Sequence, residues 1–230
     1  MTHRVIEPEW LDVLPADDPQ ALASRRDLRW LNFWMGNTSF ICAALSELFD
    51  RRQPLVLAEL GAGDGTFFLS LARNSPTQNA CGKIILVDRR PCVSPQTRLD
   101  LTGLGWKVEA IEADVFDWLR RCERVDALVA NLFLHHFDPG SLQALLNLVS
   151  QRCRVFVACE PRRCRAASLF SHGVGLLGCN VVTRHDAPIS VLAGFRGNEL
   201  SNAWPDGRWE LREQSSGLFS HLFTAREKPS

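Results

Sequence analysis

Short apolar runs alternate with amphipathic segments through the middle of the chain. The runs at 55–57, 84–87, 127–130 and 155–159 consist almost entirely of Leu, Ile, Val and Ala. Runs of this length are typical of buried strands, and the segments between them have helical spacing. Alternating strands and helices predict an α/β fold in which a mostly parallel sheet carries helices on both faces.

Two helices are predicted ahead of the first strand. Asp17-Asp18-Pro19 is a start signal, because a capping acid precedes Pro in the first turn. Apolar residues then recur at spacings of three and four as far as Met35. Gly36–Ser39 ends this helix and begins a second one. Residues 1–16 are expected to form a loosely ordered lead-in.

The pattern changes after residue 160. A helix is expected over 166–177, and the sequence His185-Asp186-Ala187-Pro188 predicts the start of another, with Asp186 as its cap. The tail contains two β-like runs, 209–213 and 218–224, which predict two further strands.

The segment 58–66, Ala-Glu-Leu-Gly-Ala-Gly-Asp-Gly-Thr, lies between an apolar strand and an apolar helix. Its three glycines allow positive φ angles and a close approach of the backbone to a ligand. The spacing excludes the phosphate-binding G-x-x-x-x-G-K-[ST] loop, because no Lys follows, and the third glycine comes one residue too early for the dinucleotide G-x-G-x-x-G motif.

Glu59, Gly61, Gly63 and Gly65 form an E-x-G-x-G-x-G pattern. This pattern resembles motif I of the class I S-adenosylmethionine-dependent methyltransferases, in which the loop surrounds the methionine end of the cofactor. Taken alone, the same glycines also suit an ordinary strand-to-helix turn. Asp88 favours the first interpretation, because an acid at the end of the second strand, 23 residues after Gly65, is placed to bind ribose hydroxyls.

Further segments extend the resemblance. Asp114 stands where the family places a group against adenine, although it would equally cap the helix that follows. The sequence Leu134-His135-His136-Phe137, after the fourth strand, is similar to small-molecule methyltransferases, including ubiquinone and menaquinone C-methylating enzymes. Glu160-Pro161 ends the fifth strand as in that family. The resemblance therefore assigns the cofactor to Glu59, Gly61, Ala62, Gly63, Gly65, Asp88, Arg89, Asp114, Val115 and Asn131.

The resemblance also implies an architecture. It predicts a Rossmann-like, doubly wound, seven-stranded sheet that is mostly parallel with an antiparallel C-terminal strand. Residues 1–50 would be an N-terminal helical extension or lid, and 51–230 the methyltransferase domain, with a substrate-side insert at about 161–205.

Histidines are the candidates for catalysis, since imidazole is the natural base near neutral pH. His135 and His136 follow a strand end, where ligands of open α/β sheets bind; alternatively, one packs under the loop and the other faces water. Trp30, Trp34 and His185 are candidates for binding the acceptor. The tryptophans would otherwise belong to a buried packing stripe, and His185 is not expected to bond its neighbour Asp186.

Bulk properties limit the partners. The 230 residues carry no formal net charge, which argues against nucleic acid. The Asn/Asp-Pro-Pro motif of base-amino methyltransferases is absent after the fourth strand, where Asn131-Leu132-Phe133 stands. The eight cysteines form no C-x-x-C pair, so no metal site is expected. Without a signal peptide or a long apolar run, we expect a reduced cytoplasmic protein with no membrane span, monomeric or homodimeric.

The sequence therefore predicts an enzyme that transfers a methyl group from S-adenosyl-L-methionine to a small, largely apolar acceptor, with S-adenosyl-L-homocysteine as product. A phenolic, hydroxyl or quinone-like acceptor fits, and oxygen is preferred over carbon as the acceptor atom. The alternatives are a non-catalytic binding or regulatory protein with the same fold, or a methyltransferase of protein or RNA.

Overall fold

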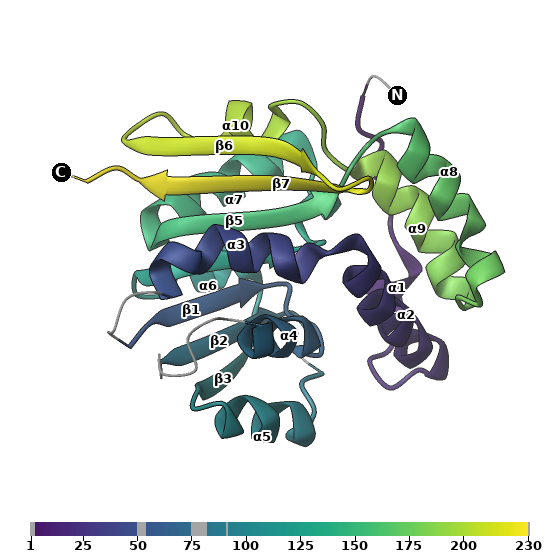
Figure 1. Cartoon of the computed structure of the whole chain (residues 1–230), viewed down its shortest axis with the longest axis horizontal. Coiled ribbons are helices and arrows are strands. Elements are labelled where there is room, and N and C mark those ends of the chain that lie inside the picture. Colours follow the sequence, from purple (N-terminus) through teal and green to yellow (C-terminus); the bar gives the residue numbers. More distant parts are fainter. Residues whose placement is uncertain (1–2, 50–53, 75–81, 91, 230) are drawn as a thin grey trace.

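A seven-stranded sheet forms the centre of the molecule (Figure 1). The computed structural model describes residues 3–49, 54–74, 82–90 and 92–229. The strand order is β3-β2-β1-β4-β5-β7-β6, with β7 antiparallel to both neighbours and the other paired strands parallel. The predicted mostly parallel sheet with an antiparallel C-terminal strand is confirmed.

The elements follow one another in the alternation that the sequence predicts. The strands are β1 Val56–Leu60, β2 Lys83–Asp88, β3 Lys107–Glu112, β4 Val125–Asn131, β5 Cys153–Pro161, β6 Trp209–Ser216 and β7 Ser220–Glu227. The α-helices are α1 Trp10–Val13, α2 Pro19–Met35, α3 Asn37–Phe49, α4 Thr66–Asn74, α5 Pro95–Gly103, α6 Val115–Arg121, α7 Pro139–Arg152, α8 Arg165–Gly173, α9 Val181–Ala193 and α10 Glu199–Ala203. Two short 3₁₀ turns are η1 Leu134–His136 and η2 Val174–Leu177.

Successive residues of the central strands point into two separate cores, as the pleat of a strand requires. Leu57 and Val129 pack with α3, α4 and α5 on one face, whereas Ala58 and Leu128 pack with α6, α7 and α10 on the other. Burial on both faces explains why these strands are continuous apolar runs. The carboxyl ends of β1, β2, β4 and β5 meet at one edge, and the order reverses between β1 and β4. This switch point is where open α/β sheets bind ligands.

The predicted N-terminal helices are present. Asp18 caps α2 by accepting hydrogen bonds from the amides of Gln20 and Ala21, and Gly36 ends the helix with a φ of 74°. The prediction of a loosely ordered lead-in over 1–16 is wrong for the residues described. Residues 3–14, which we call the N-terminal strap, include α1 and are tied to η1 and α9 by specific bonds described below.

The helical segment after β5 differs from its prediction at Asp186. Helix α9 begins at Val181 with Asn180 as its cap, and Pro188 lies inside the helix. Asp186 is therefore in the middle of α9 and does not cap it. The predicted domain boundary at 50–51 falls on residues 50–53, outside the described residues, and the division into extension, domain and insert stays a prediction.

No helix among residues 3–49, 54–74, 82–90 and 92–229 is long and apolar enough to cross a membrane.

Candidate active site

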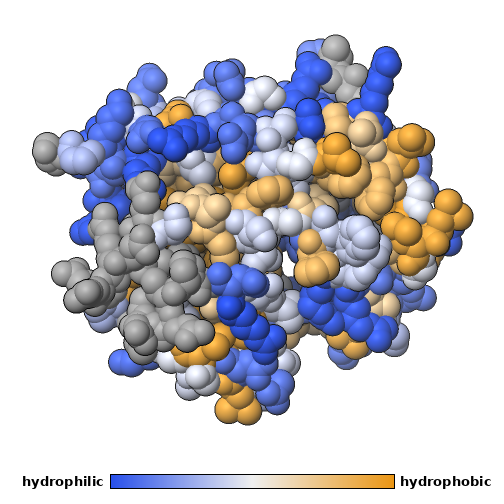
Figure 2. Space-filling view, in the orientation of Figure 1, coloured by the Kyte–Doolittle hydropathy of each residue, from blue (hydrophilic) through white to orange (hydrophobic). Residues whose placement is uncertain are grey.

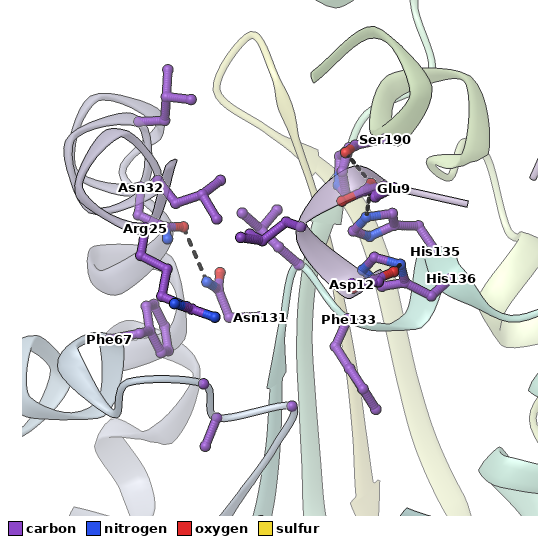
Figure 3. A pocket seen from close by; sticks show the side chains of 18 of the residues that line it. Glu9, Asp12, Arg25, Asn32, Phe67, Asn131, Phe133, His135, His136 and Ser190 are labelled. Carbon is purple, nitrogen blue, oxygen red and sulfur yellow. Dashed lines mark hydrogen bonds and ion pairs between the residues drawn. The ribbon is translucent and has the colours of Figure 1, made fainter. Parts of the chain in front are cut away.

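A cavity of about 620 Å³ lies above the carboxyl ends of the central strands (Figure 3). Its floor consists of the β1–α4 glycine loop, the end of β2 and the turn after β4, and its roof consists of α2, α8, α9 and the N-terminal strap. One part is polar and borders the glycine loop. The other part is apolar and lies under the helices. A volume of this size suits a cofactor together with a small ligand.

The glycine loop turns its backbone toward the cavity at Gly63. Gly61 and Gly63 have φ angles of 71° and 51°, which favour glycine. A Cβ on Gly61 would lie 2.2 Å from the Phe133 ring, whereas a Cβ on Gly63 would have no atom within 4 Å. Gly61 is thus required for packing, and Gly63 leaves an open face on the cavity. Gly65, with a φ of 71°, packs against Leu86 outside the lining.

Asp88 holds the glycine loop from the end of β2. Its carboxylate accepts hydrogen bonds from the amides of Gly63, at 2.9 Å, and Arg90, at 2.8 Å. A carboxylate offers about four acceptor positions, so capacity remains on the side that lines the cavity. The loop and the predicted ribose-binding acid are therefore one hydrogen-bonded unit.

Glu59 is a buried carboxyl group at the end of β1, with 2% of its surface exposed. Burial, with Asp64 and Asp88 nearby, raises its pKa well above the usual value. Its Oε2 has no hydrogen-bond partner among the described residues, although the side chain lines the cavity. Such an orphaned acceptor fits a ligand that donates hydrogen bonds, as an amino group does.

Asp114, which follows β3, has two roles. Asp114 caps α6 by accepting from the amide of Phe116 at 2.8 Å, and its other oxygen accepts two hydrogen bonds from Arg89, at 3.1 and 2.7 Å. The helix-cap alternative is thus confirmed for Asp114. Arg89 and Val115 are among the residues that line the cavity, whereas Asp114 is not.

Asn131 connects the end of β4 to the helices above it. Its Nδ2 donates to Asn32 Oδ1 at 3.0 Å, and its Oδ1 accepts from Asn37 Nδ2 at 3.0 Å. Asn37 in turn donates to Asn32 and accepts from Ser220. Asn131 lines the cavity, and this network fixes the position of α2 and α3 over the sheet.

His135 lies in a buried chain of two carboxylates and one imidazole. Its Nδ1 is 2.8 Å from Glu160 Oε2 and its Nε2 is 3.3 Å from Glu9 Oε1. Burial alone would lower the pKa of His135, but these two carboxylates raise it to about 9. Burial would likewise raise the pKa of Glu9, yet the bond and charge of His135 lower it to about 2. His135 is therefore a protonated imidazolium at neutral pH.

His136 has a different environment, although its ring contacts that of His135 in a tilted arrangement, with centroids 4.2 Å apart. Its Nδ1 lies 3.1 Å from Asp12 Oδ2, and its side chain is 25% exposed and lines the cavity. A neutral imidazole that donates Nδ1–H to Asp12 has its acceptor nitrogen at Nε2. Figure 3 shows the two histidines on one side of the cavity, below Glu9 and Ser190.

The N-terminal strap is fixed at two further points, Arg4 and the start of α1. Arg4 donates to the carbonyl oxygens of Ala193, His135 and Phe137. Asp186 of α9 accepts from the amides of Trp10, at 2.9 Å, and Leu11, at 3.0 Å. The Asp186 carboxylate therefore caps α1, which is remote in sequence, where the sequence predicted a cap for the following helix.

The candidates for acceptor binding lie away from the cavity lining. His185 bonds Asp186 at 2.8 Å, contrary to expectation, because both lie on a helix, and its ring is stacked on Trp10 at 3.8 Å. Trp30 and Trp34 are 39% and 67% exposed on the outer side of α2. A buried stripe is therefore wrong for them. None of these three predicted residues is among the described residues that line the cavity.

Several lining residues were not predicted. Glu9 and Asp12 come from the strap, and Arg25 extends from α2 toward Asn131 and the glycine loop (Figure 3). No periodic pattern marks Glu9 or Asp12 in the sequence. Arg26, Asp27 and Arg29 are charged as well as Arg25, so the sequence of α2 does not single out Arg25.

Among the described residues, Glu9, His135 and His136 bring one ligand atom each within 4.8 Å of one another, which could hold a metal ion. The raised pKa of His135 means that a metal would have to displace a proton there. Hydrogen bonds to Glu9, Glu160 and Asp12 already account for these rings, so we assign the group to proton binding.

Comparisons with solved structures identify the fold. The structure of magnesium protoporphyrin IX methyltransferase (ChlM) from Synechocystis PCC 6803 with bound SAM superposes with a TM-score of 0.56 at 10% identity, covering 95% of this chain and 88% of that chain. The plantazolicin methyltransferase BpumL in complex with SAH gives 0.61 at 12% identity, covering 92% of each chain. The chain has the class I methyltransferase fold.

This class I methyltransferase fold is also that of the pyocyanin biosynthetic protein PhzM, with a TM-score of 0.57 at 15% identity over 95% of this chain and 61% of that one. No protein-family model and no curated protein sequence matches the chain. The predicted resemblance to class I methyltransferases is therefore confirmed at the level of structure, across nearly the whole chain.

Proposed function

We propose that this protein transfers a methyl group from S-adenosyl-L-methionine to a small, largely apolar acceptor. The observation that carries the proposal is the polar end of the cavity. Three groups face the same space there: the open backbone at Gly63, the Asp88 carboxylate that holds the loop, and the buried Glu59 carboxyl, whose Oε2 has no hydrogen-bond partner among the described residues. The sulfonium of the donor would supply an electrophilic methyl group.

Each part of this end suits one part of the donor. The Gly61–Gly63 backbone and the Glu59 carboxyl would hold the amino-acid part, and Arg25 would pair with its carboxylate. Asp88 would accept from the ribose hydroxyls, and Arg89 and Val115 would border the adenine, with Asp114 holding Arg89 in place. This proposal keeps the residues that the sequence interpretation assigned to these parts of the donor, and it adds Arg25.

The other end of the cavity favours an apolar acceptor. Its walls are mainly aliphatic and aromatic side chains from α2, α8, η2, α9 and the β6–β7 turn: Leu28, Leu31, Phe170, Val174, Val191 and Phe219. Such walls exclude water from the reacting atoms, and holding the acceptor in line with the methyl group can contribute about 7–11 kcal/mol. The neighbours include BpumL solved with SAH and a monoazolic desmethylPZN analog, which supports a small-molecule acceptor.

We assign the general base to His136 and its orientation to Asp12. His135 already carries a proton at neutral pH, since its pKa is about 9, so it is unsuited to accept another. His136 lines the cavity with Nδ1 held by Asp12, which leaves Nε2 to take a proton from a hydroxyl acceptor. A positioned base favours an oxygen acceptor over carbon, and typically contributes about 10²–10⁴-fold.

Calorimetry with S-adenosyl-L-homocysteine tests the cofactor site. Asp88→Ala should weaken binding at least about tenfold, because it removes a ribose acceptor and frees the loop. Asp100→Ala is the matched control, since Asp100 of α5 is a surface acid paired with Arg73 of α4. Equal affinity in wild type and Asp88→Ala would remove Asp88 from the site.

Incubation with labelled donor and a panel of phenols, alcohols and quinones tests the reaction. His136→Gln should lower kcat about 10²-fold without changing the affinity for S-adenosyl-L-homocysteine. Strong binding of the donor without labelled product from any acceptor would instead favour the non-catalytic alternative. The cytoplasmic location and the monomeric or dimeric state stay predictions.

A further inference from the structure

Helix α2 presents apolar side chains on two opposite sides. The inner side packs against α9 and the cavity. A stripe on the outer side consists of Leu22, Arg26, Trp30, Phe33 and Trp34. These residues are four, four, three and one positions apart, which brings them to one side of the helix. Phe33 is 79% exposed and Trp34 67% exposed. A helix that is apolar on both sides is expected to contact a second apolar phase, and the cavity accounts for one side alone.

A neighbouring segment also exposes apolar side chains. Leu169 of α8 is 79% exposed and Leu176 of η2 is 94% exposed. The segments lie side by side, because Leu31, Val174 and Cys179 form one small core and the amide of Asn180 donates to Asp27 of α2. Figure 2 shows hydrophobic side chains gathered over α8. We call this surface the apolar platform; it consists of Leu22, Trp30, Phe33, Trp34, Leu169, Leu176, Leu177 and Val181.

Exposed arginines accompany the apolar platform on α2, α8 and α9, and Asp17, also exposed, precedes α2. The segment 165–185 contains Arg165 and Arg184 and no Asp or Glu, although the whole chain has no net charge. Arg26 lies within the stripe on α2, and all three arginines are exposed. Asp27, the acid of α2, turns its carboxylate to Asn180 and Thr183 of the α9 terminus. The platform is thus an apolar, tryptophan-containing surface accompanied by exposed arginines.

We propose that the apolar platform docks on the surface of a lipid bilayer that contains anionic headgroups. Trp, Phe and Leu on one helical side, accompanied by Arg, are the composition of helices that lie in the interfacial plane. Anionic lipids attract such arginines. A second copy of the chain fits less well, because a two-fold interface through this surface would bring the arginines of both copies together.

The docking surface and the cavity share their helices. Leu28 and Phe170 line the cavity from the inner sides of α2 and α8, whose outer sides form the platform. An apolar acceptor dissolved in the bilayer would thus reach the cavity along the surface that touches the lipid. This route rests on the proposed function, whereas the docking itself needs neither donor nor acceptor.

Co-sedimentation of the full chain with vesicles tests the proposal. Wild type should sediment with vesicles of phosphatidylcholine and phosphatidylglycerol, and less with phosphatidylcholine alone. Trp34→Asp and Leu176→Asp, both on exposed side chains, should each reduce the bound fraction about tenfold. Leu99→Asp is the matched control, since Leu99 is 65% exposed on α5, away from the platform, and should bind as wild type does.

Three outcomes would overturn the proposal. Wild type could stay in the supernatant with both vesicles, or Leu99→Asp could lose as much binding as Trp34→Asp. In the third outcome, sedimentation velocity shows that wild type is a dimer and that Leu176→Asp is a monomer. This result would assign the platform to contact with a second copy of the chain. Calorimetry with S-adenosyl-L-homocysteine on the same samples separates these results from a failure of the proposed function, and circular dichroism verifies folding.

Discussion

The buried chain Glu9–His135–Glu160 predicts how stability responds to pH and to the loss of one carboxylate. Glu160 is fully buried and accepts from the amides of Phe133, Leu134 and His135 as well as from the His135 ring. In Glu160→Gln, the amide oxygen can keep the first two bonds. The NH₂ group would then face N–H donors, so Nδ1 of His135 has to lose its proton and the ring becomes neutral.

The magnitude follows from the pKa of His135. A rise from 6.5 to about 9, at about 1.36 kcal/mol per pH unit, corresponds to on the order of 3 kcal/mol. Because the folded-state pKa is the higher one, this contribution is fully present below about pH 6.5 and is lost as pH rises through about 9. Breaking a buried charge pair by removing one partner typically costs about 3–5 kcal/mol, so Glu160→Gln should lose that amount at neutral pH.

Urea unfolding followed by tryptophan fluorescence, from about pH 6 to about pH 10, measures both effects. Wild type should lose stability across the alkaline half of this range, and Glu160→Gln should show a much flatter profile. Glu210→Gln is the control, because its pair with Arg212 is exposed and should contribute less than about 1 kcal/mol. Parallel profiles for wild type and Glu160→Gln would refute the reasoning, since His135 would then not carry the proton.

The other predictions concern the loop, the donor and the strap. Gly61→Ala should lower the free energy of unfolding by about 2–4 kcal/mol, because the new Cβ meets the Phe133 ring at positive φ, whereas Gly63→Ala should cost about 1 kcal/mol yet weaken S-adenosyl-L-homocysteine binding in calorimetry. Arg25→Met should weaken the same binding with an unchanged melting temperature; full affinity would exclude Arg25 from the site. Asp186→Ala should cost about 1–2 kcal/mol and speed hydrogen exchange across α1, and unaltered exchange would contradict the capping role.

The cofactor half could be predicted because its signals are local. The glycine positions, the strand that precedes them and Asp88 lie within one short part of the sequence. The glycines are recognisable because the turn needs positive φ angles. The apolar runs likewise identify the central strands, because strands that are buried on both faces are continuous apolar segments. The sheet and its loop are therefore visible in the chain itself.

The roof of the cavity could not be predicted, because its interactions join distant residues. Glu9 is polar within a polar stretch, and its meaning depends on His135, 126 positions later. Asp186 has the signature of a cap for its own helix, yet the helix that it caps is α1. Trp30 has the spacing of a core residue but faces outward, since α2 has an apolar stripe on each side. In each case the local sequence allows more than one role for the residue, and the tertiary contacts determine which role it has.

The N-terminal strap has a consequence for how the protein is made. Arg4 bonds the carbonyl of Ala193, a separation of 189 positions, so the strap cannot make this contact until α9 has been synthesised. At synthesis rates of about 5–20 residues per second, this delay is about 10–40 seconds. During that interval strands β1 to β5 can pair while the strap remains open to proteases and chaperones, and the roof of the cavity closes only after α9 has been made.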